Sequence, residues 1–152
     1  MPRLVTTTRS RRLRTPFWAA SADTGSPNSE PNRQRILIVE DDYFVATNLE
    51  HQLVEAGYEV VGVAVSAAEA VQLAKERSPN LAIVDIRLAG NSDGVEAATA
   101  LLTLYRVPSV FATAHGDPET RSRAQKANPL GWINKPYSFD VVLAVIRSAL
   151  RR

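Results

Sequence analysis

The chain of 152 residues has no cysteine, two histidines and no long apolar run. Without cysteine, a disulfide framework, a thiolate metal site, a thiol nucleophile and a redox dithiol are all excluded. His51 and His115 are too few for a histidine-rich metal cluster. No uncharged apolar segment approaches the roughly 18 residues of a membrane-spanning helix. The 45% hydrophobic and 22% charged residues are typical of one globular domain with a real core.

The net charge of +2 is the sum of two unlike regions. Residues 1–35 hold seven arginines against Asp23 and Glu30, a net charge of +5, whereas the remainder carries −3. A face that binds nucleic acid should be basic, so the mildly acidic body argues against that function. We therefore expect a body without a DNA-binding domain and without a membrane contact.

Residues 1–34 mix Arg, Ser, Thr, Pro and Asn with no sustained apolar period, which predicts a disordered basic leader. Ser10-Arg11-Arg12 resembles the start of a twin-arginine export signal. The apolar stretch 17–20 that follows is much shorter than the roughly 7–15 apolar residues that such a signal needs. We therefore expect a flexible leader or an over-called start codon, and a cytoplasmic protein.

From residue 35 onward, apolar runs alternate with segments of helical periodicity. The run 36–39 is continuous and rich in β-branched residues, as in a strand covered on both faces. Further strands are expected at 58–64, 81–84, 109–112 and 131–134, and helices at 43–56, 67–77, 94–105, from Asp117-Pro118 onward, and at 139–150. This alternation predicts an α/β fold, an open parallel sheet with helices on both faces.

Two of the expected helices carry apolar stripes. In the first helix, the residues near helical spacing are Phe44, Val45, Leu49, Leu53 and Val54. In the last helix, the expected core stripe is Phe139, Val142, Leu143, Ile146 and Leu150. Val141 and Val145 lie off that stripe. They are either ordinary exposed apolar residues or a surface for a partner or homodimer beside the fifth strand.

The carboxyl ends of parallel strands line the functional crevice of such a sheet. The residues at those ends are Glu40, Asp41 and Asp42 after the first strand, Asp85 after the third, Thr113 after the fourth and Lys135 after the fifth. Clustered carboxylates need a neutralising cation, and Mg²⁺ suits oxygen ligands. The lysine and threonine suit a phosphoryl group, so the pattern predicts phosphoryl transfer with an aspartate as acceptor. Taken singly, Asp41 or Asp42 also fits a helix N-cap.

Four motifs occur in order: residues 36–42 (ILIVEDD), 81–85 (LAIVD) with Asp93-Gly94 after it, 111–114 (FATA) and 134–136 (NKP). Through them, residues 35–150 resemble the receiver domain of two-component response regulators. The resemblance implies a flavodoxin-like sheet of order 2-1-3-4-5 within a receiver domain at 35–152. It also implies that Asp85 accepts a phosphoryl group from a phosphohistidine on a histidine kinase or a histidine phosphotransfer protein.

The resemblance assigns further roles. Glu40, Asp41, Asp85 and the backbone carbonyl of Arg87 would hold Mg²⁺. Thr113 would close onto the acyl phosphate and Lys135 would pair with it, while Asp42 matches no ligand and keeps its interpretation as a cap. Trp132 occupies the position of the family's switch aromatic, with packing on a short strand as the alternative.

The sequence departs from the family pattern around Asp85. Glu40 stands where aspartate is common, and the loop after Asp85 has Ala89 in place of a usual proline and an extra residue before Gly94, so we expect a differently shaped loop. The resemblance implies that Arg87 and His115, two residues after Asp85 and two after Thr113, flank the approach to Asp85. We expect them to shield the phosphoryl group from water; the alternative is that His115 orients the attacking water as a base.

The function predicted from the sequence is a single-domain response regulator. It signals by protein contact or serves as a phosphorelay intermediate or sink, and it is not an enzyme that acts on an external metabolite. A first alternative is an aspartyl-phosphate phosphatase of the haloacid dehalogenase type, which needs a D-x-D pair after the first strand that is missing here. A second alternative, a degenerate receiver that only binds, predicts loss of the acceptor, whereas Asp85 is present.

Overall fold

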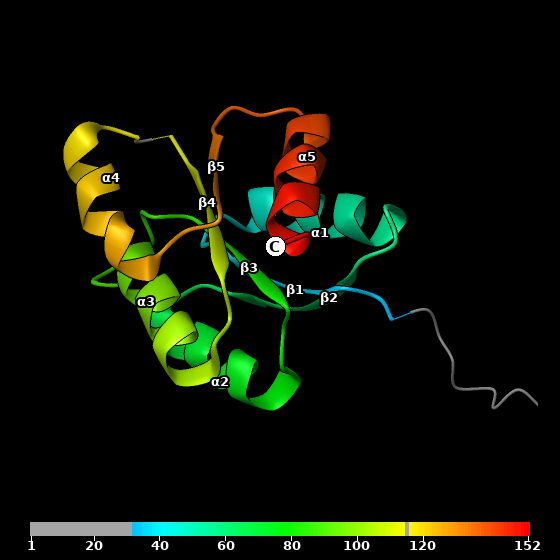
Figure 1. Cartoon of the computed structure of the whole chain (residues 1–152), viewed down its shortest axis with the longest axis horizontal. Helices are drawn as coiled ribbons and strands as arrows, with labels where there is room; N and C mark the ends of the chain where they lie inside the picture. The colour runs from blue at the N-terminus through cyan, green and yellow to red at the C-terminus, as the bar shows by residue number, and fades with distance from the viewer. Residues whose placement is uncertain (1–31, 115) are drawn as a thin grey trace, which may run out of the picture. The chain divides into compact units, whose positions relative to one another are not determined.

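The computed structural model describes residues 32–114 and 116–152. Five parallel strands form one sheet of order β2-β1-β3-β4-β5, which confirms the predicted α/β fold and its strand order (Figure 1). The strands are β1 (Arg35–Val39), β2 (Glu59–Ala64), β3 (Leu81–Val84), β4 (Ser109–Thr113) and β5 (Gly131–Asn134). The helices are α1 (Tyr43–Glu55), α2 (Ala67–Arg77), α3 (Gly94–Tyr105), α4 (Pro118–Ala124) with the 3-10 turn η2 (Gln125–Ala127), and α5 (Phe139–Leu150).

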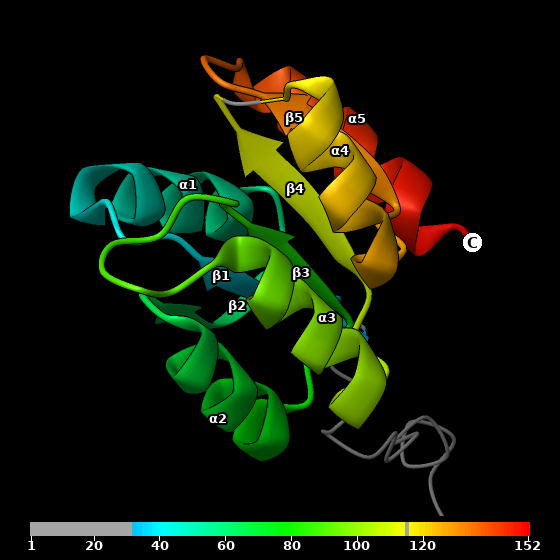
Figure 2. The same cartoon turned by 90° about the vertical axis from the view of Figure 1, so that its left-hand side faces the viewer.

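Each face of the sheet has its own core. Helices α1 and α5 cover one face, and α2, α3 and α4 cover the other (Figure 2). Neighbouring residues of β1 alternate between the two cores: Ile36 and Ile38 point toward α1 and α5, and Leu37 and Val39 toward the opposite side. Because both faces are covered, every residue of β3 and β4 is buried, and so is β1 from Ile36 to Val39.

Acidic side chains cap three of the helices. Asp42 accepts hydrogen bonds from the backbone N–H groups of Phe44 and Val45, which confirms its interpretation as the N-cap of α1. Asp93 caps α3 in the same way, and Asp117 caps α4 ahead of Pro118. These caps fix where each helix starts after a strand, and so how the loops at this edge of the sheet are shaped.

The predicted stripe of α1 is wrong at two positions. Phe44 is 82% exposed and Val54 is 55% exposed, whereas the helix buries Ala46, Leu49 and Leu53. The buried residues are spaced by three and four, which defines one face. Phe44 precedes Ala46 by two positions, and Val54 follows Leu53 by one, so both turn away from it. The small Ala46 thus belongs to the buried face, whereas the larger Phe44 and Val54 lie outside it.

The interpretation of α5 also needs a correction. The helix buries Val142, Ile146 and Ala149. Val145, expected on an outer surface, instead packs against β5, where its Cγ1 lies 2.6 Å from the position a β-carbon would take on Gly131. The absent side chain of the glycine makes room for this valine. Only Val141, at 47% exposure, fits the expectation of an exposed apolar residue.

Residues 33–152 form one compact unit. The predicted leader at 1–34, including the stretch that resembles an export signal, falls almost entirely outside the described residues. Across residues 32–114 and 116–152, the helices are all too short or too polar to cross a membrane.

Candidate functional site

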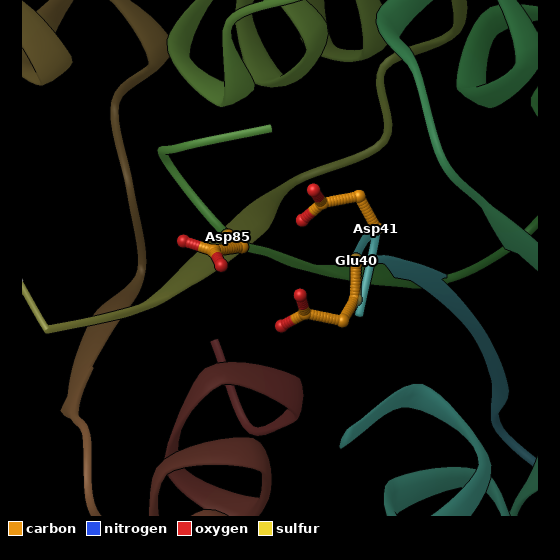
Figure 3. Close-up of side chains that lie close together, drawn as sticks. All are labelled: Glu40, Asp41 and Asp85. Atoms are coloured by element: carbon orange, nitrogen blue, oxygen red, sulfur yellow. The ribbon is translucent and has the colours of Figure 1, made fainter. Parts of the chain in front are cut away.

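Three carboxylates meet at the carboxyl edge of the sheet. Glu40 and Asp41 directly follow β1, and Asp85 directly follows β3, the strand paired with β1. One oxygen of each carboxylate lies within 4.8 Å of the others (Figure 3). The structure therefore brings together the three acidic residues that the sequence placed at adjacent strand ends.

Lys135 joins this cluster from the end of β5. Its Nζ donates to Glu40 Oε2 at 2.6 Å and to Asp85 Oδ2 at 2.9 Å. Burial raises the pKa of Glu40 above its usual value, although the hydrogen bond from Lys135 opposes this shift. Burial alone would lower the pKa of Lys135. The hydrogen bonds to Glu40 and Asp85 and the charges of these carboxylates outweigh burial, so the net pKa of Lys135 is raised. Lys135 therefore stays positively charged over the ordinary pH range, whereas burial disfavours the charged form of Glu40.

The backbone around Asp85 is tightly packed. A β-carbon on Gly94 would lie 1.8 Å from the carbonyl oxygen of Asp85, so the first residue of α3 has to be glycine. The N–H of Gly94 donates to the carbonyl of Ile86 at 2.8 Å. The helix start therefore rests directly on the backbone that carries Asp85. Sequence reasoning quoted Asp93-Gly94 as a motif but missed this contact, which depends on the packing of α3.

The loop between Asp85 and α3 closes on itself. Arg87 and Asp93 form an antiparallel bridge, and Gly90 lies in the left-handed region with φ of 71°. The N–H of Arg87 donates to Asp85 Oδ1 at 3.2 Å, while the residue as a whole is exposed. This closed loop accommodates the extra residue and the missing proline noted in the sequence.

Thr113 and Trp132 lie on β4 and β5, on the face covered by α3 and α4. Thr113 is 1% exposed and forms the last residue of β4, opposite Asn134. Trp132 packs on Phe111 with ring centroids 5.1 Å apart, so a packing role is present. Its role as a switch stays a prediction. His115 lies outside the described residues.

An apolar hollow of about 610 Å³ opens beside Lys135. Its other lining residues are Phe44, Val45 and Asn48 of α1 and Ala114, Pro136 and Tyr137 from the loops after β4 and β5. Burial raises the pKa of Tyr137, so this side chain is neutral over the ordinary pH range. Sequence reasoning missed the hollow because Phe44 was assigned to the core.

The donor set fits a hard divalent cation. Glu40, Asp41 and Asp85 offer carboxylate oxygens within one small space, as Mg²⁺ requires. Asp42 points its carboxylate to the start of α1 as a cap. The second acid of a phosphatase-type D-x-D pair is therefore lacking after β1.

Comparison with known proteins agrees with this geometry. A family model described as the response regulator receiver domain matches residues 36–147. The chain is 40% identical over 116 residues to the phyllosphere-induced regulator PhyR of Methylorubrum extorquens, and 34% identical over 119 residues to the transcriptional regulatory protein PdtaR of Mycobacterium tuberculosis. These matches cover 76% and 78% of this chain but 43% and 58% of the two relatives.

Among solved structures, the chain is similar to the signal receiver domain of a modulated diguanylate cyclase from Desulfovibrio desulfuricans. The TM-score is 0.74 at 39% identity, and the match covers 79% of this chain and 95% of that one. The family model spans well over half of the chain and includes every carboxylate of the cluster and Lys135. The chain belongs to the response regulator receiver family.

Proposed function

We propose that Asp85 accepts a phosphoryl group from a phosphohistidine on a histidine kinase or a histidine phosphotransfer protein. An Asp85 oxygen attacks phosphorus, the P–N bond to the imidazole breaks, and the bonding pair stays on that nitrogen. The observation that carries this proposal is the meeting of Asp85 with Lys135 and with two further carboxylates at one strand edge. Such a set suits the charge that develops on a transferring phosphoryl group.

Each neighbour of Asp85 has a role in this proposal. Lys135 already donates to Asp85 and would donate to a phosphoryl oxygen. Thr113, at the end of β4, would offer its hydroxyl to a second oxygen. Glu40, Asp41, Asp85 and the backbone carbonyl of Arg87 would hold Mg²⁺, which supplies charge neutralisation for the acceptor and the incoming group.

The phosphohistidine protein would dock on the hollow beside Lys135. Phe44 on its rim is 82% exposed, and Tyr43 on the same helix is 73% exposed, so α1 offers unusual apolar area next to the acceptor. A helix that carries the donor histidine between apolar residues would cover these rings and bring the phosphoryl group toward Asp85.

Arg87 would set the lifetime of the acyl phosphate. Its exposed guanidinium, two residues after Asp85, is a permanent cation that can hold phosphoryl oxygens and occupy the path of an attacking water. His115 is proposed for the same task on the sequence alone. We expect Arg87→Ala to lose phosphate faster than wild type in single-turnover decay of labelled protein; slower decay would contradict shielding.

The output of this domain would be a protein contact or onward phosphoryl transfer in the cytoplasm, with catalysis limited to its own phosphorylation and dephosphorylation. A partner or a second copy of the chain would bind at β5 and α5. The half-buried Trp132 lies on β5, and the exposed Val141 lies on α5.

Labelling with a phosphoryl donor tests the proposal. The full chain is incubated with Mg²⁺ and either labelled acetyl phosphate or histidine kinases that carry labelled phosphohistidine. An acyl phosphate is recognised because its label survives acid but is lost in base, the opposite of phosphohistidine. We expect base-labile label on wild type and on the control Asp93→Asn, and none on Asp85→Asn. Equal label on Asp85→Asn, or no label on wild type from any donor, would contradict the proposal.

A further inference from the structure

Arg121, in the middle of α4, contacts two parts of the molecule at once. The face of its guanidinium covers the ring of Trp132, with the guanidinium carbon 4.6 Å from the ring centroid. The edge of the same group donates from Nε to the carbonyl oxygen of Gly116 at 3.1 Å. One planar group therefore joins α4, β5 and the backbone that follows β4.

The backbone of Gly116 lies next to this guanidinium. A β-carbon placed on Gly116 would be 3.4 Å from Nε and from one terminal nitrogen of Arg121, and 3.6 Å from Asn134 Oδ1. These are ordinary van der Waals distances, so this stretch of backbone is in contact range of the cation. The contact is thus a packed one, in addition to the hydrogen bond.

These contacts connect to the proposed acceptor through β4. Gly116 follows Thr113 by three residues, and Thr113 is the proposed hydroxyl partner of the phosphoryl group. Phe111, two residues before Thr113, packs on Trp132, and Thr113 pairs with Asn134 just beyond Trp132. Since successive residues of a strand alternate in direction, Phe111 and Thr113 face the same side of the sheet.

We infer that Arg121 is the positioning residue that couples the state of Asp85 to the environment of Trp132. The inference rests on the proposed function, because it takes Asp85 as the acceptor and Thr113 as its hydroxyl partner. A shift of Thr113 toward the phosphoryl group changes the position of the Gly116 carbonyl. The guanidinium is bonded to that carbonyl through Nε, so its place over the indole ring changes too.

Only arginine can serve in this way. Stacking uses the face of the guanidinium and the hydrogen bond uses its edge, so both contacts exist in one geometry. Lysine keeps the cation near the ring but has no planar edge for Gly116. Lysine at this position therefore separates the cation–ring contact from the coupling.

Fluorescence of Trp132 tests the coupling. The chain has one other tryptophan, Trp18, so the full-length protein carries Trp18→Phe throughout. Beryllium fluoride with Mg²⁺ is the probe, and ¹⁹F NMR measures its occupancy independently. In the Trp18→Phe parent we expect a change in Trp132 emission at full occupancy. With Arg121→Met or Arg121→Lys added, we expect that change to fall by half or more at the same occupancy.

Arg123→Met is the matched control, because Arg123 lies on the same helix but pairs with Asp93. It should leave the Trp132 response unchanged. A full response in Arg121→Met, or no response in the parent at full occupancy, would overturn the inference. Failure of the proposed function would look different: the parent would bind no beryllium fluoride in the ¹⁹F spectrum.

Discussion

The two faces of the sheet are packed with side chains of different size. The core under α1 and α5 is built mainly from Ile, Leu and Val, and includes Ile36, Ile38, Ile83, Ile133 and Ile146. The core under α2, α3 and α4 contains eight buried alanines, compared with three on the other face. Small side chains let helices approach the sheet and one another closely, at the cost of less apolar area per residue.

The contacts that reach the candidate site follow the same division. On the alanine-rich face, Gly94 rests on the backbone of Asp85, Asp93 pairs with Arg123, and Arg121 covers Trp132. On the aliphatic face lies the hollow beside Lys135, where we propose that a partner docks, and α5 packs as an ordinary core helix. We expect the larger stability losses from truncations on the aliphatic face, where the buried side chains are larger on average, and we propose that the alanine-rich face transmits changes at Asp85.

The largest effect on stability is expected on the aliphatic face. Ile38 is fully buried in β1, and Ile38→Ala removes three carbons from a packed core. We expect the free energy of unfolding in urea to fall by about 2–5 kcal/mol, whereas the exposed control Val141→Ala should change it by less than about 0.5 kcal/mol. The folded fraction of Ile38→Ala should still be phosphorylated. Loss of labelling in protein that is still folded would contradict the division of the two faces.

Gly94→Ala should disturb stability and site together. The added methyl group overlaps the carbonyl of Asp85, so the start of α3 must move away from it. We expect a loss of about 1–3 kcal/mol in urea unfolding, with slower phosphorylation by acetyl phosphate. Helix propensity alone would make this substitution stabilising by about 1 kcal/mol, so a gain in stability would show that the contact is not limiting.

Glu40→Gln should stabilise the protein at pH 7 without Mg²⁺, by less than the loss in Gly94→Ala. The pKa of Glu40 is raised in the folded state, so folding favours its neutral form. Below the usual value of 4.5, both states are protonated and the variant has no advantage. As the pH rises, Glu40 ionises in the unfolded chain before it ionises in the folded protein. The stability advantage of Glu40→Gln over wild type therefore grows until the pH passes the folded pKa of Glu40. Urea unfolding at several pH values measures this, and a constant difference would contradict it.

Mg²⁺ should reduce or reverse the stability advantage of Glu40→Gln over wild type. A bound cation offsets the cost of the Glu40 carboxylate, so Mg²⁺ should raise the unfolding midpoint of wild type more than that of Glu40→Gln. Equal stabilisation of the two proteins by Mg²⁺ would remove Glu40 from the proposed ligand set.

The smallest effect is expected from the ion pair between α3 and α4. Asp93→Asn keeps an oxygen that caps α3 but removes the charge that pairs with Arg123. Because both side chains are partly exposed, we expect about 0.2–1 kcal/mol in a double-mutant cycle with Arg123→Gln. Asp93→Ala should cost about 1 kcal/mol more, since the cap is lost as well. A coupling energy near zero would mean that this ion pair contributes nothing to the attachment of α4.

Local patterns in the sequence predicted much of the fold. The apolar runs 36–39 and 81–84 form strands as their composition predicts, and Asp42 and Asp117 mark helix starts by capping, which is local to the chain. The meeting of Glu40, Asp41 and Asp85 followed because the ends of parallel strands share an edge.

The parts that sequence reasoning missed depend on contacts between distant residues. Val145 turned inward because Gly131, fourteen positions earlier, has no side chain. Phe44 lies outside because Ala46 occupies the buried face of α1. The stack of Arg121 on Trp132 requires α4 to lie over β5, which no spacing within either segment indicates.

The central claim is that Asp85 carries the phosphoryl group, and chemical trapping tests it most directly. Borohydride reduces an aspartyl phosphate to homoserine, so the protein is phosphorylated with acetyl phosphate and Mg²⁺, reduced, digested and sequenced by mass spectrometry. The account predicts homoserine at position 85, and none there when Mg²⁺ is replaced by a chelator. Homoserine at position 41 or 93 in place of 85, or none at any position in protein shown to carry label, would contradict it.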